Sequence, residues 1–405
     1  MAEPAVPSPA ATPGPARAVG PLELFFDLVF VFAVSQLSDH LLTHLNWRGA
    51  GETAILLVAV FSVWAYTSFE ATSRDVERKD TQRTLLAVMF LGLFMNAAIS
   101  SAFSSSPWPF AVPYLISQIG PNAVTAITVG PAELRHHYRR ALVWLGAATP
   151  LWVAGAILQP RPRLACWAAA AAIDLAGTWL AHPLPGRTLH SRQVPFDGEH
   201  MIERLRLFLI IALGEAVLTT GTAIAAAPTR VLTVAAGVAG LAVVVTFWAM
   251  YFGGSDSLVA RHLGRTTDPI RAARLGLNGT YLTLAALVAL AVGNELVIAH
   301  PGGDGSPTLS LLLFGGALFY VASQAWYLQL TTGTASRARW AACGALVAGG
   351  CAAAGLPRLA GLGLLLIVLG ALTWHLIRNQ SAPDHPGHAT PERQPRWWPV
   401  RRRSP

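Results

Sequence analysis

The stretch from residue 21 to residue 42, PLELFFDLVFVFAVSQLSDHLL, is long and apolar enough to cross a bilayer, yet it carries Glu23, Asp27, Asp39 and His40. An acid at the centre of a spanning helix costs about 2.5–3.5 kcal/mol on insertion scales, so such residues usually face a bundle interior or a wet cavity. The rest of the chain must therefore supply helices that surround this segment and offset the cost.

The composition places the chain among membrane proteins. It has 405 residues, of which 53% are hydrophobic and 12% charged, whereas soluble domains carry about 25% charged residues. The net charge of +8 comes from Arg residues in short loops and the C-terminal tail, so it does not indicate a nucleic-acid partner. Cys166, Cys343 and Cys351 all lie in apolar stretches, so we expect no disulfide, metal site or cofactor.

Hydropathy predicts an all-α polytopic transmembrane bundle of about twelve spans, within a membrane domain over residues 21–378. Disordered tails are predicted at 1–20 and at the basic segment 379–405. Pro113 and Pro121 are expected to kink the fourth span, and the last two spans form either a tight hairpin or one broken segment. The predicted spans are 22–44, 52–70, 84–104, 108–129, 140–159, 163–182, 206–226, 231–252, 275–299, 309–330, 338–356 and 358–378.

Basic residues follow the expected alternation between the two sides of the membrane. With twelve spans, the side that holds both tails carries 24 of the 29 Arg and Lys residues, and the other side carries 5. Because cytoplasmic loops are enriched in these residues, the split predicts that both termini are cytoplasmic.

The first span holds one candidate binding site for an ion or solute. Glu23 and Asp27 are four residues apart and therefore share one face of the helix. An interfacial position explains Glu23 and Asp39 equally well. Asp27 is flanked by apolar residues on both sides, which favours a buried pair or a functional role.

A second polar stripe lies in GEHMIERLRLFLIIALGEAVLTTG, residues 198–221. His200, Arg204 and Glu215 fall on one helix face, and Glu215 lies about 15 Å into its span. A carboxylate at that depth must be protonated, paired with a cation or hydrated. His200 and Glu203 have a spacing that suits a metal, but two ligands are too few to predict a metal site.

Asp174 is a further acid in mid-span, within AAAAAIDLAGTWL. Several tryptophans, Trp64 and Trp152 among them, are interpreted as interfacial aromatic belts. No nucleophile motif or phosphate-binding loop stands out, so we expect no enzymatic activity.

These stretches resemble the bacterial low-temperature-requirement A (LtrA) family, through ELFFDLVFVFAVSQL at 23–37 and HMIERLRLFLIIALGEAVLTTG at 200–221. Asp174 and GNELVIAHP at 293–301 are lesser matches. The resemblance covers roughly residues 20–380 and implies a multi-pass inner-membrane protein in which Asp27, His200, Glu203 and Glu215 are important. One departure is Leu205-Arg206, where the family pattern has an aromatic followed by a small or polar residue, so Arg206 shifts the expected start of this span.

Three functions remain open at this point. The first is a secondary transporter of a small solute or ion, with candidate binding residues Glu23, Asp27, Asp174, His200, Glu203, Arg204 and Glu215. An ion channel would need a continuous polar path instead. A membrane scaffold or intramembrane enzyme that supports growth at low temperature is the third. Spans 1 and 7 both begin with Glu and a run of apolar residues, which leaves a six-plus-six duplication open.

Overall fold

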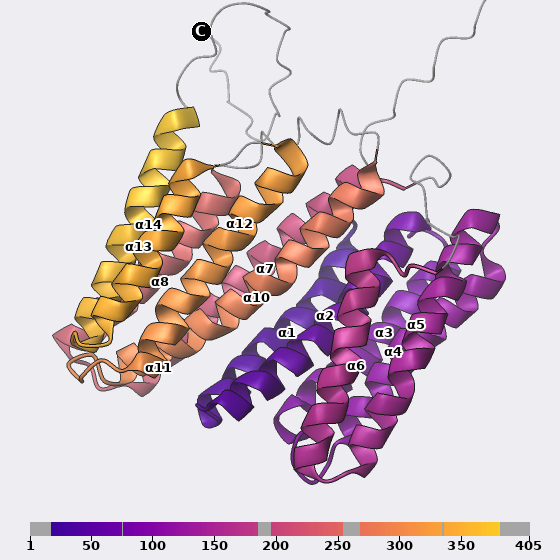
Figure 1. Ribbon diagram of the computed structural model, residues 1–405, viewed down its shortest axis with the longest axis horizontal. Helices are drawn as coiled ribbons and strands as arrows, with labels where there is room; N and C mark the ends of the chain where they lie inside the picture. The colour runs from indigo at the N-terminus through magenta and orange to yellow at the C-terminus, as the bar shows by residue number, and fades with distance from the viewer. Residues whose placement is uncertain (1–17, 75, 185–195, 254–267, 334–335, 381–405) are drawn as a thin grey trace, which may run out of the picture.

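The computed structural model describes residues 18–74, 76–184, 196–253, 268–333 and 336–380. Apart from residues 18–20 and 379–380, the two predicted tails lie outside these ranges. The described residues form an all-helical bundle (Figure 1). Its helices are α1 (Pro21–Thr43), α2 (Trp47–Ser73), α3 (Lys79–Ala97), η1 (Ile99–Ser101), α4 (Trp108–Thr128), α5 (Ala132–Ile157), α6 (Pro160–Leu180), α7 (Gly198–Ala226), α8 (Val231–Phe252), α10 (Pro269–Ala299), α11 (Pro307–Ser310), η3 (Leu311–Gly315), α12 (Gly316–Thr332), α13 (Arg337–Ala353) and α14 (Arg358–Gln380).

Local signals in the sequence fix many of the helix starts. Asn46, Asp197 and Asp268 each accept a hydrogen bond from the backbone N–H three residues further on, as N-cap residues do. The cap at Asp197 starts α7 at Gly198, eight residues before the predicted span. The helix therefore extends its first turns beyond the apolar segment, and His200, Glu203 and Arg204 all belong to it.

Every predicted span overlaps a helix, although several spans extend a few residues beyond it. Eight helices in the described residues are long and apolar enough to cross a membrane: α1, α2, α5, α7, α8, α10, the α11–α12 unit and α14. The helices α3, α4, α6 and α13 occupy the other four predicted spans, so the count of twelve spans stays a prediction. The helix α4 continues through Pro113 and Pro121, and α13 and α14 are two separate helices packed against each other.

The helices form two sets, which we call the N-terminal half (α1–α6) and the C-terminal half (α7–α14), on the two sides of Figure 1. The two halves share an order of helix contacts. In the N-terminal half, α1 contacts α2 and α3, and α2 contacts α3 and α6. In the C-terminal half, α7 contacts α8 and α10, and α8 contacts α10 and α14. The third, fourth, fifth and sixth helices then contact one another in succession. Here α11, η3 and α12 count as one helix. The helices α1 and α2 contact α7 and α10 across the interface between the halves.

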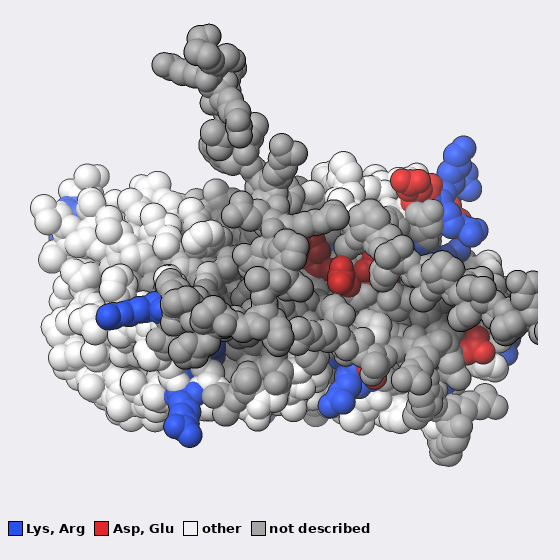
Figure 2. Space-filling model, turned by 90° about the horizontal axis from the view of Figure 1, so that it is seen from above, with Lys and Arg blue, Asp and Glu red and all other residues white. Residues whose placement is uncertain are grey.

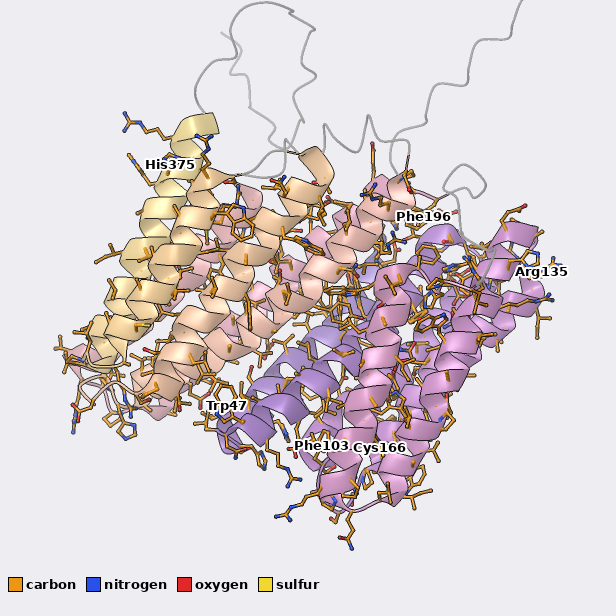
Figure 3. All side chains as sticks on the ribbon, in the orientation of Figure 1. Trp47, Phe103, Arg135, Cys166, Phe196 and His375 are labelled. Carbon is orange, nitrogen blue, oxygen red and sulfur yellow. The ribbon has the colours of Figure 1, made fainter. Side chains whose placement is uncertain are left out.

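The start of α1 and the end of α14 lie at the same end of the bundle (Figure 1). Figure 3 places Arg135, Phe196 and His375 near this end and Trp47, Phe103 and Cys166 near the opposite end. Viewed from above, the described charged residues are scattered among wide uncharged areas (Figure 2). Two contacts connect helix ends on this side: Glu23 with His200, and Arg206 with Phe252.

Candidate functional site

Four of the residues predicted from sequence meet at the interface between the halves. The two acids of α1, Glu23 and Asp27, face His200 and Arg204 of α7, and both pairs of residues are spaced by four. His200 Nε2 lies 3.0 Å from Glu23 Oε1, and Arg204 Nη2 lies 3.0 Å from Asp27 Oδ1. The matching spacing means that α1 and α7 run parallel. We call these four residues the interface cluster.

The interface cluster is sealed from its surroundings by aromatic side chains. Glu23, Asp27 and Arg204 are 0% exposed and His200 is 2% exposed. Trp64 of α2 donates from its indole N–H to Asp27 Oδ1 at 2.7 Å, and the Arg204 guanidinium lies over the Trp64 ring at 5.6 Å. The predicted belt position of Trp64 is wrong, as is that of Trp152, because both rings are fully buried.

The charges in the interface cluster do not balance without an added proton. Glu23 and Asp27 are two potential anions, and Arg204 is one permanent cation. The cluster is electroneutral only if His200 or one of the carboxyl groups holds a further proton. Leaving a net charge in a dry protein interior is expensive, so this proton has a large energetic effect. Asp27 Oδ2 has no hydrogen-bond partner within the described part of the chain.

Asp174 lies in a separate buried site within the N-terminal half. Its Oδ2 accepts hydrogen bonds from the Tyr114 hydroxyl at 2.6 Å and the Trp152 indole at 2.9 Å. Its Oδ1 is buried without a partner among the described residues. The structure thus brings α4, α5 and α6 together around this acid, apart from the interface cluster.

The remaining two candidates, Glu203 and Glu215, do not join the interface cluster. Glu203 pairs with Arg206 at 2.9 Å, and both side chains are partly exposed. Glu215 is partly exposed, between exposed Gly214 and exposed Val217, and makes no hydrogen bond or ion pair in the described part of the chain. The Asp27 side chain thus points into the bundle, as expected for an acid within a span, whereas the Glu215 side chain lies on a stretch of α7 that other helices cover only in part.

Two hollows lie along the interface between the halves. The first, which we call the Trp47 crevice, lies between Leu41 and Trp47 on one side and Pro307 and Leu311 on the other. The second, which we call the Arg274 cavity, lies between α2 and α6 on one side and α10 on the other. Sequence reasoning did not identify the residues of either hollow, because no local pattern marks them.

An aromatic layer separates the interface cluster from the Arg274 cavity. The Trp64 ring stacks on Phe61 with centroids 5.1 Å apart, and Phe61 meets the ring of Tyr281 edge-on at 4.6 Å. Phe208, one turn after Arg204, packs on Trp64 at 4.5 Å. Tyr281 lines the cavity and Trp64 binds Asp27, so the two sites share a continuous set of packed rings.

No solved structure matches the chain. The chain is 29% identical over 314 residues to the uncharacterized protein RA0937 of Rhizobium meliloti (strain 1021). The matched region covers 76% of this chain and 77% of that protein. Residues 18–374 match the family of the bacterial low temperature requirement A protein (LtrA). Since this match covers most of the sequence, including both helices of the interface cluster, the chain belongs to the LtrA family.

Proposed function

We propose that this LtrA-family membrane protein is a secondary transporter that couples movement of a small solute to a proton, with no enzymatic step. The observation that carries the proposal is the interface cluster, a fully buried set of charges that needs one proton for neutrality. It lies between two halves, where transporters built from repeats bind their substrates and coupling ions. Protonation there can bias one arrangement of the halves over another.

A six-plus-six duplication is part of the proposal. The shared order of helix contacts in the two halves supports it. So does a sequence pattern at the fourth position of each half, Tyr-x-x-Ser-Gln. It occurs as Tyr114, Ser117 and Gln118 in α4 and as Tyr320, Ser323 and Gln324 in α12, and all six side chains are buried. Two parallel halves with an even number of spans are related by an axis along the membrane normal.

The transporter is favoured over a channel by the packing between the interface cluster and the Arg274 cavity. A channel needs a continuous polar path, whereas the Arg274 cavity is closed from the interface cluster by Phe61, Trp64 and Phe208. A closed site with access changing by movement of the halves fits this arrangement.

We further propose twelve spans in the inner membrane with both termini cytoplasmic. The 24-to-5 split of basic residues supports this topology, and so does the position of the start of α1 and the end of α14 at the same end of the bundle (Figure 1). A reporter enzyme that works only in the periplasm should be inactive when fused after Gln380 and active when inserted in the loop 300–306. Activity after Gln380, or none at the loop, would contradict the topology.

The movement itself can be measured across the Trp47 crevice. Spin labels are attached at Trp47→Cys and Thr308→Cys, with the three native cysteines replaced by Ala. Double electron–electron resonance spectroscopy should then give two populations of the distance between the labels. Their ratio should differ between a pH of about 5.5 and one of about 8.5, which bracket the histidine titration. The two positions are exposed, so the labels fit without repacking the core. One distance distribution, unchanged by pH, would contradict a proton-controlled movement of the halves.

A further inference from the structure

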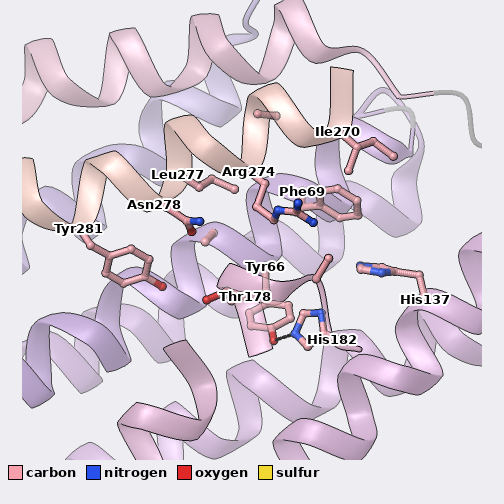
Figure 4. Close-up of a pocket in the computed structure, with 13 residues that line it drawn as sticks. Tyr66, Phe69, His137, Thr178, His182, Ile270, Arg274, Leu277, Asn278 and Tyr281 are labelled. Carbon is pink, nitrogen blue, oxygen red and sulfur yellow. Dashed lines mark hydrogen bonds between the residues drawn. The ribbon is translucent and has the colours of Figure 1, made fainter. Parts of the chain in front are cut away.

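The Arg274 cavity contains polar groups that the fold does not use. About 640 Å³ of space free of protein atoms lies at this site, open solvent included. Figure 4 shows Arg274 reaching from α10 toward Phe69, with Tyr66, His182 and His137 on the opposite side. The lining residues are Ala65, Tyr66, Phe69, His137, Thr178, Ala181, His182, Ile270, Ala273, Arg274, Leu277, Asn278 and Tyr281.

His182 presents an unused polar atom in this cavity. Its Nε2 is hydrogen-bonded to the Tyr66 hydroxyl, and when that hydroxyl donates, the ring proton lies on Nδ1. The Nδ1 atom is buried and has no partner among the described residues, and His182 as a whole is 4% exposed. In this tautomer the ring offers its Nδ1–H as a donor to the cavity.

Arg274 adds a cation that the described part of the chain leaves without a hydrogen bond or ion pair. None of the lining residues is acidic. Asp174, one turn of α6 from Thr178, is not among the lining residues; its Oδ2 is occupied by Tyr114 and Trp152, and its Oδ1 has no partner among the described residues. Asp268, the N-cap residue of α10, is also outside the lining, and its charge acts on Arg274. The polar groups facing the space are thus suited to an anion.

We propose that the Arg274 cavity binds a small organic monocarboxylate, held by the Arg274 guanidinium and the His182 ring N–H. A guanidinium matches the two oxygens of a carboxylate. The walls from Phe69, Leu277 and Tyr281 suit an apolar body, which an inorganic anion lacks. This inference rests on the proposed transport function and names its substrate class, since the cavity lies at the interface between the halves.

Binding is tested on the full-length protein in detergent by calorimetry, with isovalerate and benzoate as probes. Isovaleramide and benzamide are the matched neutral compounds, and inorganic phosphate is the matched anion. Both carboxylates should bind, and the amides and phosphate should bind at least about tenfold more weakly. Equal binding of the amides would leave only an apolar pocket, and tighter binding of phosphate would identify an inorganic anion site; either result overturns the proposal.

Variants assign the binding to this cavity. Arg274→Gln should weaken carboxylate binding at least about tenfold, while Arg271→Gln, an exposed arginine on the same helix, should leave it unchanged. Tyr66→Phe removes the hydroxyl that orients His182 and should weaken binding while the protein stays folded. Unchanged binding in Arg274→Gln overturns the proposal. The binding test uses no vesicles and is therefore independent of the flux test. Carboxylate binding without flux would reject the transport function alone, and flux without carboxylate binding at Arg274 would reject this inference alone.

Discussion

Replacing Arg204 with Gln is expected to destabilise the protein more than any other single change in the interface cluster. The guanidinium is 0% exposed and lies 3.0 Å from Asp27 and 3.6 Å from Glu23. Its loss leaves two buried carboxyl groups without their permanent counter-charge. Removing one partner of a buried ion pair costs about 3–5 kcal/mol, so we expect at least this loss in the free energy of unfolding. Thermal unfolding of the purified protein in detergent measures it.

The matched control is Arg206→Gln, two residues further along α7. The Arg206–Glu203 pair is partly exposed on both sides, and such pairs contribute about 0–1 kcal/mol. Adding Asp27→Asn to Arg204→Gln should restore part of the stability, because one of the two stranded acids is then neutral. Equal effects of the two arginine changes, or no recovery in the double variant, would contradict the interface cluster as a charge-balanced unit.

Replacing Asp27 with Asn is expected to abolish proton-coupled flux while the protein stays folded. The amide oxygen still accepts the Trp64 indole hydrogen bond, and Glu23 still balances Arg204. The variant cluster is therefore neutral without the extra proton, and it has no reason to exchange one. Flux in vesicles should fall to the level of vesicles without protein, and thermal stability should remain close to that of the unchanged protein.

The variant Glu215→Gln distinguishes a proton-binding site in the interface cluster from one at Glu215, an acid deep in the span of α7. The structure leaves Glu215 partly exposed and without a described partner, so our proposal predicts that this variant retains flux. The opposite pattern, with flux lost in Glu215→Gln and kept in Asp27→Asn, would move the proton-binding role from the interface cluster to Glu215.

The helices could be predicted from the sequence because their causes are local. Apolar runs of near-membrane length and N-cap residues such as Asp197 and Asp268 lie within the segments that they shape. Pairing between α1 and α7 was partly predictable as well. Two residues four apart on each helix share a face, and acids on one helix and bases on the other are natural partners.

The features that the sequence did not predict depend on which neighbouring helix covers each face of a helix. Helix periodicity aligns Glu215 with Arg204, but it does not show whether a neighbouring helix still covers that face further along α7. Trp64 and Tyr66 lie two residues apart on α2, one bound to Asp27 and the other to His182. Nothing in the surrounding apolar sequence distinguishes them from interfacial aromatics. His182, just after α6, and Arg274 of α10 line one cavity because the two halves pack against each other there, which no local sequence pattern shows.

The central claim is that the interface cluster couples a proton to solute movement, and flux in liposomes tests it most directly. Purified protein is reconstituted into vesicles that contain a pH-sensitive dye, and classes of solute are added outside one at a time: carboxylates, amino acids, sugars and inorganic ions. We predict that, for at least one class, the internal pH changes faster with the unchanged protein than in vesicles without protein, and that Asp27→Asn removes this excess rate. No excess rate with any class, or an equal excess with Asp27→Asn, would contradict the account.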